Sequence, residues 1–212
     1  RMLFAFLVVN RNRTLTRGEL LEALWADGRD GGLAPLLSKL RRVVTLDDYR
    51  ILLPQGAWVD VDAAADAAHR AESAIALGDF HRAWGPSQVT MFIAGRTFLP
   101  GDDAAWIDEV RRQLGELHLR ALEAYAKAGL AIGGTELAAA VRVGRELTRR
   151  EPYRETGYQL LMEALVREGN PAEALLVYET LRTRLRDELG IAPSPQTREL
   201  HRHLLSQPGT IS

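Results

Sequence analysis

The chain has 212 residues, 46% of them apolar, and a formal net charge of −1, so charge alone gives no reason to expect a nucleic-acid binder. It contains no cysteine, which excludes disulfides and thiol catalysis and fits a reducing compartment. The charge is unevenly spread, because residues 1–50 hold nine Lys/Arg against six Asp/Glu, whereas residues 60–110 hold three against nine. The length allows one or two domains with a sizeable core.

The first segment predicts two helices. Residues 2–10 read as a buried or amphipathic helix that is far too short to cross a bilayer. The chain opens inside this apolar pattern, so we expect further residues, forming small strands, to precede it. Thr16 and Glu19 have the spacing of a capping box, which starts a second helix that we expect to run to Asp27. Residues 28–32 are glycine-rich and predict a loop.

A third helix and a hairpin follow. Pro35 suits a first helical position, where its missing N–H costs nothing, and leucines at helical spacing continue to about Val44. Residues 49–53 and 57–61 look extended, with a turn at 54–56. Three helices and a short hairpin are in the order of a winged helix-turn-helix.

The rest of the chain predicts helices only. In the segment 80–93, Gly85-Pro86 should break or kink the helix. An aspartate at 102 or 103 is expected to cap a long helix, and Gly78 to end the Ala-rich helix that starts at Asp62. The expected helices cover 62–77, 80–93, 104–128, 136–149, two helices around a turn at 169–171, and 196–205.

The pair of helices around Gly169-Asn170-Pro171 is the most informative stretch. Pro152 precedes the pair and Gly190 stops it. This arrangement is typical of a tetratricopeptide-type helical pair, which buries its apolar face by stacking on neighbours. Such stacks usually bind partners rather than catalyse.

The predicted fold is therefore mainly α. We expect a winged helix-turn-helix with a short β-hairpin at 1–61, an all-α, tetratricopeptide-like helical domain at 62–206, and a disordered tail at 207–212.

Several strings together resemble one family. Leu15 to Trp25 resembles the second helix of the winged helix in the bacterial transcriptional activation domain family, which includes the Streptomyces antibiotic regulatory proteins. Ser38 to Arg42 resembles the end of its recognition helix. Three further strings resemble successive landmarks of its activation domain: Trp58 to Asp62, Phe98 to Trp106, and Glu151 to Pro195. The resemblance covers nearly the whole chain, in the right order.

This resemblance implies a sequence-specific DNA-binding activator of actinobacterial type. The sequence shows no phosphate loop and no activated nucleophile, so we expect neither catalytic activity nor a cofactor. The absence of cysteine fits a cytoplasmic protein. The winged helix would bind double-stranded DNA at direct repeats beside a promoter. The helical domain would contact RNA polymerase or the second protomer of a homodimer. No membrane partner is implied.

The chain departs from the family where bases are read. Residues 31–36 offer no side chain capable of a bidentate base contact, and Pro35 shortens the helix that should enter the major groove. The wing is short, and Asp47 and Asp48 would repel phosphates. The side chains left for DNA suit phosphate contacts, which position a protein without specifying sequence. They are Ser38, Lys39, Arg41, Arg42, Arg11, Arg13 and Arg17.

Other interpretations of these residues stay open. Arg41 and Arg42 also fit a solvated helix end that the helix dipole favours. Trp25 and Trp58 are expected to anchor the core rather than to stack on bases. A winged helix that no longer reads DNA, in an effector-binding or protein-interaction module, is the alternative function.

Basic residues of the helical part suggest a site for an anionic small-molecule effector, such as a nucleotide second messenger. A solvated face balanced by Glu146 and Glu151 is the competing interpretation. The five histidines show no metal-site spacing with matching carboxylates. The candidate effector residues are Arg111, Arg112, Arg142, Arg145 and Arg149.

Overall fold

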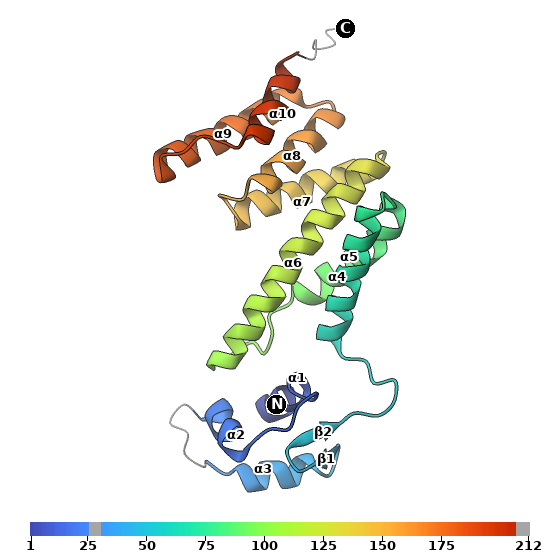
Figure 1. Cartoon of the computed structure of the whole chain (residues 1–212), viewed down its shortest axis with the longest axis vertical. Coiled ribbons are helices and arrows are strands. Elements are labelled where there is room, and N and C mark those ends of the chain that lie inside the picture. The colour runs from blue at the N-terminus through green and yellow to red at the C-terminus, as the bar shows by residue number, and fades with distance from the viewer. Residues whose placement is uncertain (26–30, 207–212) are drawn as a thin grey trace. The chain divides into compact units, whose positions relative to one another are not determined.

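The computed structural model describes residues 1–25 and 31–206, which fall into two compact units. The first unit comprises Arg1–Asp60 and Arg96–Leu114, and the second comprises Val61–Gly95 and the chain from Gly115 onward. Figure 1 shows the order of the elements, coloured from blue at the N-terminus to red near the C-terminus. The predicted tail at 207–212 lies outside the described residues, and so do residues 28–30 of the loop predicted at 28–32.

The first unit contains the predicted winged-helix order, which confirms that part of the fold prediction. Its elements are α1 (Met2–Val9), α2 (Arg17–Leu24), α3 (Leu33–Leu40), β1 (Thr45–Asp47) and β2 (Arg50–Leu52). Figure 1 shows the hairpin next to the end of α3.

The start of α2 is fixed by the predicted capping box. The Thr16 hydroxyl accepts from the Glu19 backbone N–H, and the Glu19 carboxylate accepts from the Thr16 backbone N–H at 2.8 Å. Both bonds satisfy N–H groups that a helix start leaves open, so this short helix begins at a defined residue.

Leucines and aromatic rings form the core of the first unit. Leu7, Leu20 and Leu33 are fully buried there. Trp106 belongs to the same core, because its ring meets Phe6 edge-on at 5.1 Å and its indole N–H donates to the Ala23 carbonyl at 3.0 Å. The landmark around Trp106 is therefore part of the winged-helix unit.

The expected start of the third helix and the expected place of the hairpin are wrong. The third helix begins at Leu33, so Pro35 occupies its third position, where the N–H still lacks an intrahelical acceptor. The hairpin turns at Asp48-Tyr49, because the strands pair Thr45 with Leu52 and Asp47 with Arg50. Asp48 adopts a φ of 50°, a left-handed conformation that aspartate tolerates better than most residues.

The second unit is built from helices, as predicted. Helices α7 to α9 stack in sequence, each against the next, around Leu147, Met162 and Leu165. The predicted helical pair is α8 and α9, and Gly190 ends α9 with a φ of 68°. The helices that follow the hairpin are α4 (Asp60–Ala76), α5 (Phe80–Ala94), α6 (Ala105–Ile132), α7 (Glu136–Arg150), α8 (Glu155–Arg167), α9 (Pro171–Leu189) and α10 (Pro195–Ser206). The part of α6 up to Leu114 belongs to the first unit, and the rest belongs to the second.

The sequence predicts a break or a kink at Gly85-Pro86. The break does not occur, since α5 continues from Phe80 to Ala94 with Pro86 inside it. The polar side chains after the proline are held inside the helix. The Ser87 hydroxyl donates to the Ala83 carbonyl at 2.8 Å, and the Thr90 hydroxyl lies 3.1 Å from the carbonyls of Ala64 and Pro86. These bonds satisfy the hydroxyl groups of two buried side chains, Ser87 and Thr90, on the turn that follows the proline.

Trp58 does not anchor a core. Its side chain is 70% exposed, in a segment without regular structure before α4, whereas Trp25 packs against the core of the first unit as expected. Within the described residues, no helix combines the length and apolarity that crossing a membrane requires.

Candidate nucleic-acid interface

Helix α3 buries one face and exposes the other. Leu33 and Leu37 hold it in the core of the first unit, while Ala34, Pro35 and Leu36 are exposed. The exposed face therefore begins with small or apolar side chains, and only its second half carries polar ones. These are Ser38 and Lys39.

Arg41 and Arg42 follow directly after α3, in a turn that leads into β1. Backbone bonds fix this turn, because the N–H of Arg41 donates to the Leu37 carbonyl at 2.9 Å and that of Val43 to the Leu40 carbonyl at 3.0 Å. Both arginines are exposed.

A hollow of about 650 Å³ lies between this turn and the hairpin. Val43, 77% exposed, contributes an apolar surface beside the two guanidinium groups. The remainder of the wall comes from β2 and the residues that follow it. The lining residues are Arg41, Arg42, Val43, Val44, Thr45, Leu52, Leu53 and Pro54.

The cations at this end of α3 are not neutralised locally. In the part of the chain that the structure describes, Lys39, Arg41 and Arg42 form no ion pair. All three are exposed, so their positive charge faces solvent at the end of the helix and the start of the hairpin.

Arg11 and Arg13 stabilise the turn between α1 and α2. Arg11 donates to the Val8 carbonyl at 3.0 Å, and Arg13 donates to Asn10 and pairs with Glu19 at 2.5 Å. The backbone N–H of Thr16, followed by the bond from Arg13, lowers the pKa of Glu19 to about 2. Arg13 therefore reinforces the capping box, while Arg17 is exposed at the first position of α2.

The tip of the hairpin is acidic, as the sequence predicts. Asp47 pairs with Arg50 across the turn at 3.2 Å, and Asp48 is exposed at the turn itself. Since Arg50 offsets one of the two carboxylates, about one negative charge remains at the tip.

The candidate effector arginines do not share one environment. Arg111 holds a loop, because it donates to the carbonyls of Phe98, Leu99 and Asp102 at 2.8–3.0 Å. Arg112, its neighbour, forms a surface pair with Glu109 at 2.5 Å.

The other three lie on α7, on one face as predicted. Arg145 pairs with Glu173 of α9 at 2.7 Å. Arg142 and Arg149 are exposed, and neither is ion-paired within the described ranges. Arg142 borders a hollow.

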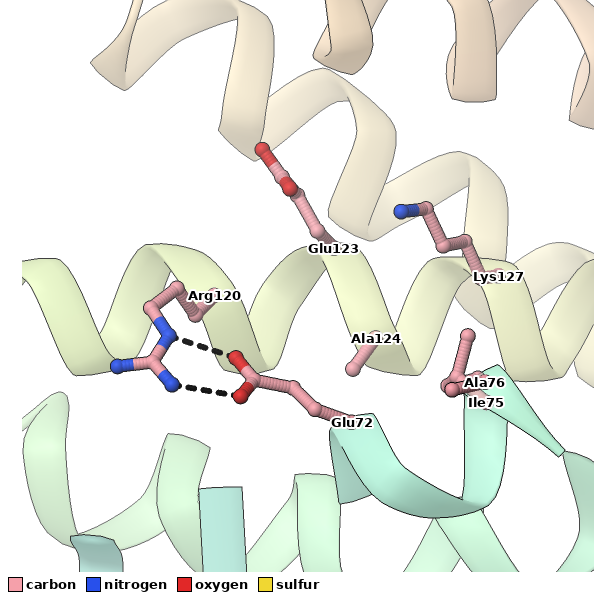
Figure 2. A pocket seen from close by; sticks show the side chains of 7 residues that line it. All are labelled: Glu72, Ile75, Ala76, Arg120, Glu123, Ala124 and Lys127. Carbon is pink, nitrogen blue, oxygen red and sulfur yellow. Dashed lines mark hydrogen bonds and ion pairs between the residues drawn. The ribbon is translucent and has the colours of Figure 1, made fainter. Parts of the chain in front are cut away.

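Figure 2 shows a smaller hollow of about 260 Å³ between α4 and α6. Glu72 and Arg120 meet there through two bonds of 2.6 Å, and these bonds lower the pKa of Glu72. Glu123, also in the wall, pairs with Arg154 at 2.6 Å. Both carboxylates of this hollow are therefore ion-paired with arginines. Among the lining residues, Lys127 is the charged side chain without an ion pair.

No pattern in the sequence marks His118, which is 7% exposed and borders the hollow beside Arg142. From the sequence alone, a single histidine in a helix can be either buried or exposed, and only the packing of the helices shows which. Among the residues that the structure describes, no three His, Asp or Glu side chains gather as metal ligands.

Comparison with known proteins identifies the family. The model of the bacterial transcriptional activator domain matches residues 59–205. The chain belongs to this family. The match begins and ends close to the predicted limits of the helical domain, and it confirms the family that the motifs predict.

Relatives extend the similarity across the winged helix. The chain is 34% identical to the regulatory protein AfsR of Streptomyces coelicolor over 97% of its own length, and 28% identical to the transcriptional regulatory protein EmbR of Mycobacterium tuberculosis over 98%. It spans only 22% of AfsR and 57% of EmbR. These relatives are named as regulators, not as enzymes.

A solved structure has the same fold. The structure of Mycobacterium tuberculosis EmbR in complex with a low affinity phosphopeptide superimposes with a TM-score of 0.81 at 27% identity. The similarity covers 97% of this chain and 58% of that one. It supports the presence of both a winged helix and a helical domain in this chain.

Proposed function

We propose that the chain is the DNA-binding and activating part of a transcriptional regulator in the cytoplasm. Its winged helix binds double-stranded DNA, and its helical domain contacts RNA polymerase or a second protomer. The proposal includes no catalytic step and no cofactor. The family and the relatives named as regulators support it. They do not favour the alternative, a module whose winged helix no longer binds DNA.

The observation that carries the proposal is the cationic end of α3. Lys39, Arg41 and Arg42 stand exposed at the junction with the hairpin, without ion pairs among the described residues. Exposed cations at a recognition helix and wing neutralise phosphates, and counterion release then drives binding. Arg11 and Arg13 contribute less, because they already stabilise a turn.

Base reading would rest on few side chains. Ser38 and Lys39 offer polar contacts, and the exposed Ala34 and Leu36 suit contact with thymine methyl groups in the major groove. Sequence preference should therefore be modest per site, and repeated sites bound by two protomers would raise it.

Fluorescence anisotropy with a duplex of mixed sequence tests the proposal at about 50 mM and about 200 mM salt. We expect salt-sensitive binding, and in Arg41→Ala/Arg42→Ala a shallower dependence of log K on log salt, by about 2. Two exposed arginines of α9, changed in Arg182→Ala/Arg186→Ala, are the matched control and should leave binding unchanged. Equal loss in both double variants, or no binding at the lower salt, contradicts the proposal.

A further inference from the structure

A mainly apolar hollow of the second unit lies between α5, α6 and α7, with a volume of about 580 Å³. This is within the range of sites for small organic ligands, roughly 300–1,000 Å³. Apolar side chains dominate its wall: Met91, Phe92, Leu122, Tyr125 and Val143. Phe92 is 71% exposed, so a large ring stands at the rim with little protein over it.

Arg142 supplies a charge to this apolar surface. It is exposed on α7, and no carboxylate pairs with it in the parts of the chain that the structure describes. The carboxylate in the wall, Glu146, has a partner of its own, because Arg150 donates to its Oε1 at 2.7 Å. The charge of Glu146 is thereby offset, and the guanidinium of Arg142 remains for a ligand.

His118 is a buried polar side chain in the wall of this hollow. Its side chain is 9% exposed, and neither ring nitrogen has a hydrogen-bond partner among the described residues. Glu146 Oε1 lies 3.8 Å from Nε2, beyond hydrogen-bond range. The ring also packs tightly, since a Cβ on Gly95 would lie 2.9 Å from its Cε1. A buried, unsatisfied polar group is unfavourable, and such groups in native proteins often mark a functional site.

We propose that this hollow binds a small organic carboxylate with an apolar, aromatic-sized body. The carboxylate pairs with the guanidinium of Arg142, and the body packs against Phe92, Met91 and the other apolar residues of the wall. A planar guanidinium suits a carboxylate because it donates two parallel hydrogen bonds. The site is separate from the DNA contacts of the proposed function and does not depend on them.

Two probes of the same shape separate the charge from the apolar body. Naphthalene-1-acetate carries the carboxylate, and naphthalene-1-acetamide is its neutral counterpart. Calorimetric titration of the whole chain should show binding of the carboxylate about tenfold tighter than that of the amide, the size expected for one charge-assisted contact.

Variants then assign the two contributions. In Arg142→Gln the advantage of the carboxylate over the amide should disappear. In Arg149→Gln, an exposed arginine on the same helix outside the hollow, the advantage should remain. In Phe92→Ala both probes should bind more weakly by a similar factor. Phe92 is exposed, so folding should be retained, and circular dichroism checks this.

The outcomes decide the proposal. It is overturned if neither probe binds at concentrations up to about 2 mM, the weak end of measurable affinity. It is also overturned if Arg142→Gln and Arg149→Gln reduce the advantage of the carboxylate equally, because binding would then follow net charge. DNA binding measured on the same variants reports on the proposed function separately.

Discussion

Gly144 of α7 lies directly against Leu161 of α8, so that a Cβ on Gly144 would stand 3.0 Å from both Cα and Cβ of Leu161. The contact is reciprocal, since a Cβ on Gly157 of α8 would lie 3.0 Å from Cβ of Leu147. Each helix thus presents a glycine to a leucine of the other. This arrangement lets α7 and α8 approach closely in the stack that forms the core of the second unit.

Gly144→Ala should therefore strain this contact. Gly115 in α6 is the control, because a Cβ there meets nothing within 4 Å. Gly115→Ala should stabilise the protein by about 0.4–1 kcal/mol through helix propensity. Relative to it, Gly144→Ala should be less stable by about 1–3 kcal/mol, the usual cost of overpacking. Urea unfolding followed by circular dichroism measures both, and equal stabilisation would show that the helices separate freely.

Arg111 and Arg112 are adjacent in sequence and should differ sharply in effect. Arg111 donates to three backbone carbonyls in a loop where Leu99 has a φ of 44°, whereas Arg112 makes a surface ion pair. Arg111→Gln should lower the free energy of unfolding by about 2–3 kcal/mol, since hydrogen bonds from charged donors are lost. Arg112→Gln should change it by less than about 0.5 kcal/mol. Similar values for the two variants in urea unfolding would refute the role of Arg111 in holding the loop.

Much of the helical architecture could be predicted because its signals are local. The capping box at Thr16 and Glu19 and the glycine stop at Gly190 involve residues within one turn of each other. The place of the hairpin could not be predicted in this way, because two neighbouring segments compete as its turn. Its turn uses Asp48 in a left-handed conformation, while the Pro54–Gly56 segment, which carries stronger turn residues, lies just beyond the second strand.

The candidate sites were harder to predict, because charge in the sequence does not reveal pairing. The sequence grouped Arg111 with Arg142 as basic residues, yet Arg111 serves a loop and Arg142 borders a hollow. His118 gave no signal, since its importance depends on burial between helices distant in sequence. By contrast, the exposure of Ser38 and Lys39 follows from helix periodicity, which places Leu33 and Leu37 inside.

Trp58 and Trp106 also look alike in sequence and should behave differently. Trp58 is 70% exposed, while Trp106 packs between Phe6 and Phe98 and donates to the Ala23 carbonyl. Trp106→Ala should cost about 3 kcal/mol or more, the range for removing a packed aromatic side chain. Trp58→Ala should change stability by less than about 0.5 kcal/mol. A large loss of stability from Trp58→Ala in urea unfolding would restore the expectation that this residue anchors a core.

His118 should make stability depend on pH in a defined direction. Burial, with Arg150 as the second cause, lowers the pKa of His118 from its ordinary value of 6.5, and Glu146 and the Met91 carbonyl oppose this only partly. The unfolded chain therefore binds the proton more readily, so the contribution of His118 is complete above pH 6.5 and is lost as the pH falls from there towards the folded value. One proton limits the slope to about 1.4 kcal/mol per pH unit. In His118→Phe this slope should vanish, so that the free energies of unfolding of the two proteins, measured in urea from pH 8 to pH 5, converge or cross as the pH falls. Parallel profiles across that range would mean that the imidazole is protonated as easily in the folded protein as in the unfolded chain.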